Sequence, residues 1–329
     1  MNRDRDEAAR VVDVRSHEVN AAITLGRALV ANLARVVYGS DEAMTAAAVA
    51  ALCGGHLLIE DIPGVGKTVL ARALALSLGA RMSRVQGHPD LLPSDITGVS
   101  VFAPDTGRWE FRRGPVFADV VLVDELNRTP PRTQSALLET MEERQVTVDG
   151  ESWALPQPHL VIATQNPRSQ LGTFPLVESQ LDRFAVATSI GYPSPEQEAE
   201  LVLHAGGTYA LDELQPVCTP EEWRRAQSAV EGVLVDRALA DYAVEICRRS
   251  RSAPGVYLGA SPRASIWLVR AAQAHAVLEA RDYAVPDDVK AMTRACLAHR
   301  ILAADEDDGP ERAAEVVRTL LETTPAPRL

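Results

Sequence analysis

The stretch LLIEDIPGVGKTVLARALALSLGA, from Leu57 to Ala80, decides which fold this sequence predicts. It begins as an apolar strand, passes through a turn rich in proline and glycine, and continues into a helix after Gly-Lys-Thr. The turn almost fits the phosphate-binding spacing G-x-x-x-x-G-K-[ST], with Asp61 at the position of the first glycine. Backbone N–H groups of Gly64 to Thr68 would then face an anion at the start of the helix. An ordinary glycine-rich turn is the alternative.

Three side chains of this turn carry separate expectations. Lys67 would reach the β- and γ-phosphates of a nucleotide, and the hydroxyl of Thr68 would bind Mg²⁺. Asp61 tolerates unusual backbone angles better than most residues that have a side chain. Its carboxylate would repel phosphate unless it is turned away. The stretch therefore predicts a nucleotide site with one departure from the usual pattern.

Short apolar strands and helices alternate along the chain around this stretch. Strands of this length without a polar face are typical of a parallel sheet that helices cover on both sides. We therefore predict a doubly wound α/β domain over residues 1–190, which includes N-terminal helices and a helix N-cap at Ser40. The expected strands are His56–Asp61, Ser83–Gln86, Val120–Asp124, Leu160–Gln165 and Ala185–Ile190.

Two stretches interrupt this alternation, at residues 99–114 and 144–155. Each carries a turn signal between alternating runs, Asp-Thr-Gly in the first and Asp-Gly in the second, so each predicts a β-hairpin. Residues 191–329 contain amphipathic helical patterns and no convincing strand. They predict a second, all-helical domain.

The composition excludes several classes of protein. Hydrophobic residues make up 46% and charged residues 24%, as in a globular protein rather than a disordered or membrane-spanning one. The net charge of −12 disfavours nucleic acid and anionic membranes as partners. No apolar run reaches the roughly 18 to 20 residues of a membrane span, and the charged start is no secretion signal, so we expect a cytoplasmic protein without membrane insertion. The four widely spaced cysteines predict buried thiols rather than disulfides or zinc ligands.

Polar side chains follow two further predicted strands. Asp124 and Glu125 end one of them, and Asn166 ends the next. Because the carboxyl ends of parallel strands share one edge of the sheet, these side chains should lie beside Lys67. Asp124 would hold Mg²⁺, Glu125 would be the general base for the attacking water, and Asn166 would orient that water. A charge pair at a helix start and an Asn-Pro turn are the alternatives.

Five motifs, in this order, resemble those of MoxR-type AAA+ ATPases: EDIPGVGKT, VDELNRTPPRTQSALLETMEERQVTVDG, ATQNP, LDRF and GASPRASIWL. The resemblance extends from about Val19 to Ile301. It implies ATP and Mg²⁺ as cofactors, a sheet with the strand order 5-1-4-3-2, and a lid role for the helical domain. It also identifies the two hairpins as the helix-2 insert and the pre-sensor-1 insert.

The resemblance also implies roles for the residues at the strand ends. Lys67 and Thr68 match the Walker A pair, Asp124 and Glu125 match the Walker B pair, and Asn166 matches the first sensor. The nucleotide-binding set that it implies is Pro63, Gly64, Val65, Gly66, Lys67, Thr68, Val69 and Arg263.

Two arginines complete the implied site. Arg183 in LDRF matches the arginine finger that AAA+ rings present to the nucleotide of a neighbouring subunit; surface pairing with Asp182 and Glu178 is the alternative. Arg263 matches the second sensor, which reaches the nucleotide from the lid. Ser261 would cap the helix that carries it, and an unpaired arginine at a helix start favours a nearby anion such as ATP. Further candidates for contacts between subunits are Arg128, Arg132 and Arg168.

These expectations favour one function over two alternatives. The favoured function is Mg²⁺-dependent ATP hydrolysis by a homo-oligomeric, hexameric ring. Such a ring would remodel partner proteins as a chaperone during maturation or metal-cofactor loading, with a von Willebrand factor A domain protein as a partner. The alternatives are a nucleic-acid motor or magnesium-chelatase-like ATPase subunit, and a nucleotide-gated scaffold with little hydrolysis. A pure switch would not need Glu125, Asn166 and Arg183 together, which disfavours the scaffold.

Overall fold

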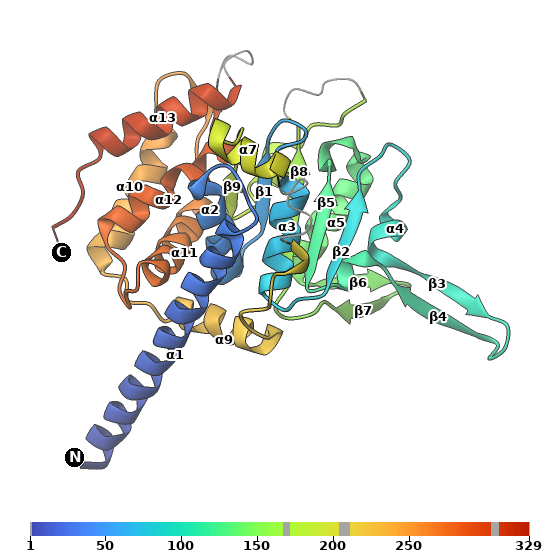
Figure 1. The fold of residues 1–329 in the computed structure, drawn as a ribbon, viewed down its shortest axis with the longest axis horizontal. Helices are drawn as coiled ribbons and strands as arrows, with labels where there is room; N and C mark the ends of the chain where they lie inside the picture. Colours follow the sequence, from blue (N-terminus) through green and yellow to red (C-terminus); the bar gives the residue numbers. More distant parts are fainter. Residues whose placement is uncertain (1, 167–171, 204–210, 304–308, 329) are drawn as a thin grey trace.

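A five-stranded parallel sheet forms the centre of the molecule (Figure 1). The computed structural model describes residues 2–166, 172–203, 211–303 and 309–328. The strand order β2-β5-β8-β1-β9 is the predicted order 5-1-4-3-2 read from the opposite edge, so that prediction is confirmed. The strands are β1 (Leu57–Glu60), β2 (Met82–Gln86), β5 (Val120–Asp124), β8 (Leu160–Gln165) and β9 (Val186–Thr188).

The apolar strands are buried on both faces, as their composition predicts. In β1, Leu57 and Ile59 belong to one hydrophobic cluster, whereas Leu58 belongs to a second one. Successive side chains of a strand point to opposite faces, so these two clusters are the two sides of the sheet. Because all five strands are parallel, their carboxyl ends lie together along one side of the sheet, between its two covered faces.

N-terminal helices cover one face of the sheet and also touch the second domain. The long helix α1 (Asn2–Ala34) packs against α2 (Asp41–Leu52) and α3 (Lys67–Ser77), and also against the lid helix α9 (Pro220–Glu231). Ser40 caps α2, as predicted, by accepting a hydrogen bond from the backbone N–H of Glu42. The indole of Trp223 in α9 donates a 2.9 Å hydrogen bond to the carbonyl of Ala51. The N-terminal helices thus join the two parts of the molecule.

Both predicted hairpins are present. β3 (Gly98–Ala103) pairs with β4 (Arg108–Arg113), and β6 (Gln145–Val148) pairs with β7 (Glu151–Ala154). The hairpin of β3 and β4 projects far from the sheet (Figure 1). The helix α4 (Pro93–Thr97) precedes β3, whereas the 3₁₀ turns Pro115–Phe117 and Leu126–Arg128 and the helix α5 (Pro131–Glu143) lie between β4 and β6.

The second domain is helical, with one addition to the predicted pattern. A short antiparallel pair joins β10 (Val256–Leu258) to β11 (Leu302–Ala303), which the sequence analysis did not anticipate. Two or three residues per strand leave too little alternation to recognise in a sequence. The other helices of this domain are α7 (Pro195–Leu203), α10 (Arg237–Ser250), α11 (Pro262–Leu278), α12 (Pro286–Leu297), the 3₁₀ turn Ala298–Arg300 and α13 (Gly309–Thr323), whereas the short helix α6 (Glu178–Leu181) precedes β9 in the α/β domain.

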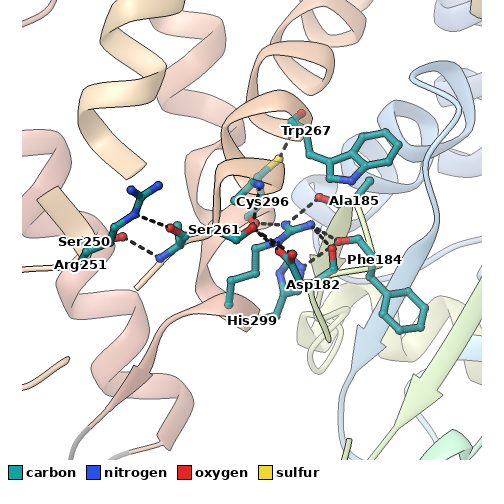
Figure 2. Close-up of polar contacts among 12 residues, drawn as sticks. Asp182, Phe184, Ala185, Ser250, Arg251, Ser261, Trp267, Cys296 and His299 are labelled. Atoms are coloured by element: carbon teal, nitrogen blue, oxygen red, sulfur yellow. Dashed lines mark hydrogen bonds and ion pairs between the residues drawn. The ribbon is translucent and has the colours of Figure 1, made fainter. Parts of the chain in front are cut away.

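A buried arginine attaches the lid to the α/β domain. Arg300, only 5% exposed, donates through Nε to Asp182 at 2.8 Å and through Nη2 to the carbonyl of Phe184 at 2.5 Å. Ser261 at the start of α11 donates to the same carboxylate (Figure 2). Since a buried charge is stable only when it is paired, this cluster holds the lid firmly at the segment that precedes β9.

All four cysteines are free and buried, which confirms the predicted thiols. Burial raises the pKa of Cys53 and of Cys218 to about 12, so both thiols stay protonated. Across the described residues, no helix combines the length and the apolar character that crossing a membrane requires.

Candidate active site

The loop between β1 and α3 presents unpaired backbone N–H groups. Gly66 precedes α3 in the left-handed region, with φ 94°, and no side chain caps this helix start. The first hydrogen bond of the helix runs from the N–H of Leu70 to the carbonyl of Gly66. The N–H groups of Lys67, Thr68 and Val69 therefore lie at an uncapped helix N-terminus, where an anion binds most readily.

The side chain of Asp61, the departure from the usual glycine, points toward the residues that follow β9. It is 6% exposed, and its Oδ2 accepts hydrogen bonds from the N–H groups of Ile190 and Gly191, at 2.6 and 2.8 Å, and from the hydroxyl of Ser189. Its Oδ1 accepts from the N–H of Ile62 at 2.8 Å. The carboxylate thus ties the loop to the end of β9, and four donors compensate its charge.

Lys67 lies between the ends of two adjacent strands. Its Nζ donates to the carbonyl of Asp61 at 2.5 Å and lies 3.4 Å from the carbonyl of Gln165. Partial burial lowers the pKa of Lys67, although the carboxylates of Asp61, Asp124 and Glu125 counteract this effect. The ammonium group is therefore held at the carboxyl edge of the sheet, beside the loop.

Asp124, at the end of β5, has the surroundings of a cation ligand. Its Oδ1 accepts a 2.7 Å hydrogen bond from Thr164, and its Oδ2 lies 3.5 Å from the hydroxyl of Thr68. Arg84 on β2 supplies a positive charge to the same Oδ2 at 2.7 Å. Carboxylate and hydroxyl oxygens are the ligands that Mg²⁺ prefers, so the oxygens of Asp124 and Thr68 fit the predicted ion.

Glu125 follows with a backbone conformation that is rare for a residue with a side chain, φ 56° and ψ 51°. Its N–H donates to the hydroxyl of Thr164 at 2.9 Å. Its Oε2 accepts from Gln86 at 3.2 Å and lies 3.3 Å from Nε of Arg128. Gly87 allows this fit, because a Cβ there would lie 2.2 Å from the carbonyl oxygen of Glu125.

Asn166 lies directly after β8, on the same edge. Its carbonyl accepts a 3.3 Å hydrogen bond from Nδ2 of Asn127, which belongs to the turn after Glu125. The structure therefore brings five predicted residues to one edge of the sheet, from three different segments of the chain: Lys67, Thr68, Asp124, Glu125 and Asn166.

Sequence reasoning missed several partners of these residues. Thr164 contacts both members of the acidic pair, and Arg84 and Gln86 reach that pair from β2. These residues contact the acidic pair because β2 and β8 lie on either side of β5 in the sheet. Predicting the contacts from the sequence would require the register of these neighbouring strands.

A groove that the sequence did not predict adjoins the loop between β1 and α3, which we call the phosphate loop. It encloses about 380 Å³ and is lined by Val36, Tyr38, Val65, Val69, Tyr192 and Pro193. The predicted loop residues Pro63, Gly64 and Gly66 line it as well. A mostly apolar cleft of this size is suited to a nucleotide base. A larger cavity of about 630 Å³ lies elsewhere, between Asp182 and the lid, and the phosphate loop does not line it.

Arg183 and Arg263 lie at the other end of the strands, where the parallel strands begin. Ala185, two residues after Arg183, donates to the carbonyl of His56, which directly precedes β1. A four-residue strand spans about 13 Å, and this length separates the two edges. The structure therefore does not bring these arginines to the phosphate loop of the same chain. The expectation that Arg263 reaches it from the lid is not met within one subunit.

One carboxylate pairs with both arginines. Glu142 lies 3.3 Å from Nη2 of Arg183 through Oε2, and its Oε1 accepts a hydrogen bond from Nη2 of Arg263. Arg263 is thus not unpaired, and the partner of Arg183 is neither Asp182 nor Glu178. Ser261 does cap the helix, by accepting from the N–H of Ala264.

The further arginine candidates occupy separate positions. Arg128 lies beside Glu125 in the same chain, which favours a role within one subunit. Arg132 is exposed near the start of α5. Arg168 lies outside the described residues.

Comparisons with known proteins agree with this architecture. Residues 56–186 match the family described as ATPase family associated with various cellular activities (AAA), and residues 248–320 match the AAA lid domain. The chain is 44% identical to the Bacillus subtilis protein YeaC, over 92% of this chain and 95% of that protein. It is 36% identical to Chaperone MoxR1 of Mycobacterium tuberculosis, over 93% of this chain and 83% of that protein.

A solved structure has the same fold. It comes from Cytophaga hutchinsonii and is described as a candidate ATPase; it superposes with a TM-score of 0.86 at 30% identity and covers 96% of this chain and 99% of its own. Since relatives above 30% identity extend over nearly the whole chain, the ordered motifs reflect common descent. The chain belongs to the MoxR family of AAA+ ATPases.

Proposed function

We propose that the protein hydrolyses ATP with Mg²⁺ at the carboxyl edge of its sheet. The observation that carries this proposal is the convergence of Lys67, Asp124, Glu125 and Asn166 beside an uncapped helix N-terminus. Family membership supports it, because the matched domain is that of an ATPase family. The groove beside the loop has room for the base of the nucleotide.

Each residue has a chemical task in this proposal. The N–H groups after Gly66 and the ammonium of Lys67 bind the β- and γ-phosphates. Thr68 and Asp124 hold Mg²⁺, which when bound neutralises charge on the phosphates. Glu125 accepts a proton from the attacking water, and the amide of Asn166 orients that water.

Arg183 and Arg263 are absent from this site within one subunit, which supports assembly. Both come from the other end of the strands, and a four-residue strand separates that end from the phosphate loop by about 13 Å, so they can meet the nucleotide of a neighbour. A finger supplied by a second subunit is worth about 10³ to 10⁵ in rate. We therefore propose a homo-oligomeric ring, with six subunits as the expected number.

The ring would act in the cytoplasm as a chaperone-like remodeller. A relative named Chaperone MoxR1 supports this role. The expected task is maturation or metal-cofactor loading of partner proteins, together with a von Willebrand factor A domain protein. Turnover that double-stranded DNA stimulates would instead favour a nucleic-acid motor.

Glu125→Gln provides the test. We expect specific activity of the unaltered protein to rise with protein concentration as subunits assemble. In Glu125→Gln, ATP binding should persist while turnover falls by at least about 10²-fold, since a general base contributes this much. The measurements are phosphate release over a concentration series and nucleotide binding at equilibrium. Concentration-independent turnover that survives the substitution would contradict the proposal.

A further inference from the structure

Glu142 occupies a junction between three parts of the chain. It is the penultimate residue of α5, whereas Arg183 follows α6 and Arg263 lies in the first turn of the lid helix α11. Each oxygen of its carboxylate contacts one guanidinium group: Oε2 contacts Arg183, and Oε1 accepts a hydrogen bond from Arg263. A single carboxylate therefore joins an arginine of the α/β domain to an arginine of the lid.

The surroundings of this carboxylate are strongly positive. A pocket of about 260 Å³ is lined by Arg144, Arg183, Arg263 and Arg270, and Glu142 is the one carboxylate among the described residues that line it. Arg270 has other partners, the ring of Trp267 and the carboxylate of Glu231. Without Glu142, the two guanidinium groups that share it would repel each other.

The geometry of the pairing leaves donors for another anion. Both contacts use only the Nη2 atom of the guanidinium. Within the described part of the chain, Nε and Nη1 of Arg183 and Arg263 have no carboxylate partner. A guanidinium has five N–H donors in a fixed plane, so one group can keep its bond to Glu142 and still bind phosphate.

We propose that Glu142 is a positioning residue that holds Arg183 and Arg263 side by side, oriented for the terminal phosphate of a nucleotide bound to a neighbouring copy of this chain. This inference rests on the proposed function, because it needs a site completed by a second subunit. Glu142 does not touch the nucleotide in this arrangement. It sets the direction of two groups that do.

Glu142→Gln removes the charge and keeps the size of the side chain. We expect kcat to fall by about 10- to 10²-fold, the cost of slight misplacement of catalytic groups, with KM for ATP nearly unchanged. Glu142→Asp keeps the charge and should recover part of kcat. Glu143→Gln, on the adjacent exposed residue without an ion pair among the described residues, is the matched control and should behave as the unaltered protein.

Mixed assemblies test whether Glu142 acts on the neighbour's site. Glu142→Gln retains its own phosphate loop, and Glu125→Gln retains its arginines. In a random equal mixture, about one quarter of the interfaces combine an intact loop with an intact arginine pair, so activity should return to about a quarter of the full value. Arg183→Ala mixed with Glu125→Gln is the reference pair.

The outcomes separate the two proposals. Recovery in both mixtures supports the inference for Glu142. Recovery with Arg183→Ala but not with Glu142→Gln overturns the inference and leaves the proposed function intact. If neither mixture recovers, the site is not shared between subunits, and both the proposed assembly and the role of Glu142 fail. Unchanged kcat in Glu142→Gln overturns the inference directly.

Discussion

At the scale of the residue, Asp61 explains how a phosphate loop can lack its first glycine. A carboxylate beside phosphate would weaken binding, but this one is buried and accepts four hydrogen bonds from Ile62, Ser189, Ile190 and Gly191. It fixes the entry of the loop against β9. The aspartate at the position of the first glycine therefore anchors the loop rather than weakening the site.

Replacing Asp61 by Ala tests this anchor. The substitution leaves buried N–H groups without an acceptor, so we expect the free energy of unfolding to fall by about 1 to 3 kcal/mol. Nucleotide affinity should fall as well, because the loop is no longer held. Denaturant unfolding and equilibrium binding of ATP would measure the two effects. Asp90→Ala, at an exposed aspartate, is the control; equal behaviour of the two variants would rule the anchor out.

At the scale of the element, an aromatic cluster joins the two hairpins. Phe111 on β4 stacks on Trp153 of β7, with ring centroids 5.0 Å apart, and also meets Phe117 edge-on at 5.8 Å. Further out on the same hairpin, Trp109 is 71% exposed and contacts only Phe102 among the aromatic rings of the described residues. The base of the projecting hairpin is thus packed, and its outer part is open to solvent.

Phe111→Ala and Trp109→Ala should therefore differ. Loss of Phe111 removes a half-buried ring from two aromatic contacts and should cost about 1 to 3 kcal/mol of unfolding free energy, less than a fully buried phenylalanine. Loss of the exposed Trp109 should change it by about 0.5 kcal/mol or less. Denaturation of the two variants side by side gives the comparison. A larger loss for Trp109 would mean that the outer hairpin is packed in solution.

At the scale of the whole molecule, the lid and the α/β domain are joined by charge as well as by apolar packing. Arg300 reaches Asp182 and the carbonyls of Phe184 and Ala185, at the edge of the sheet that carries Arg183. The lid residue Arg263 meets the α/β domain close by, through Glu142. The ion pairs of Arg300 and Arg263 therefore add to the packing of the N-terminal helices, and they lie at the end of the strands opposite the phosphate loop.

Arg300→Met should weaken this junction more than any surface change in the lid. Removing one partner of a buried pair typically costs about 3 to 5 kcal/mol, because the remaining charge is left uncompensated. Calorimetry should show a lower unfolding temperature and an earlier transition of the lid. Arg312→Met, which loses an exposed pair with Glu315, serves as the control. Equal unfolding temperatures for the two variants would exclude Arg300 as the anchor.

The sequence by itself determined the sheet, the hairpins and one half of the site. Apolar strands bounded by turns dictate a covered parallel sheet, and its geometry places every residue that follows a strand at one edge. Lys67, Asp124, Glu125 and Asn166 could therefore be grouped from their places in the chain. Local pattern was enough, because each lies close in sequence to the strand that positions it.

Only the tertiary structure decided which residues surround the group formed by Lys67, Asp124, Glu125 and Asn166, and where the arginines lie. Thr164 and Arg84 reach Asp124 through strand register, and Glu142 meets Arg263 across 121 positions of the chain. Such pairs depend on how separate elements pack, and the periodicity of residues within one helix or strand does not predict that packing. The chain carries the arginines at one edge and the phosphate loop at the other because a strand has two ends, and this separation is why a second subunit enters the proposed mechanism.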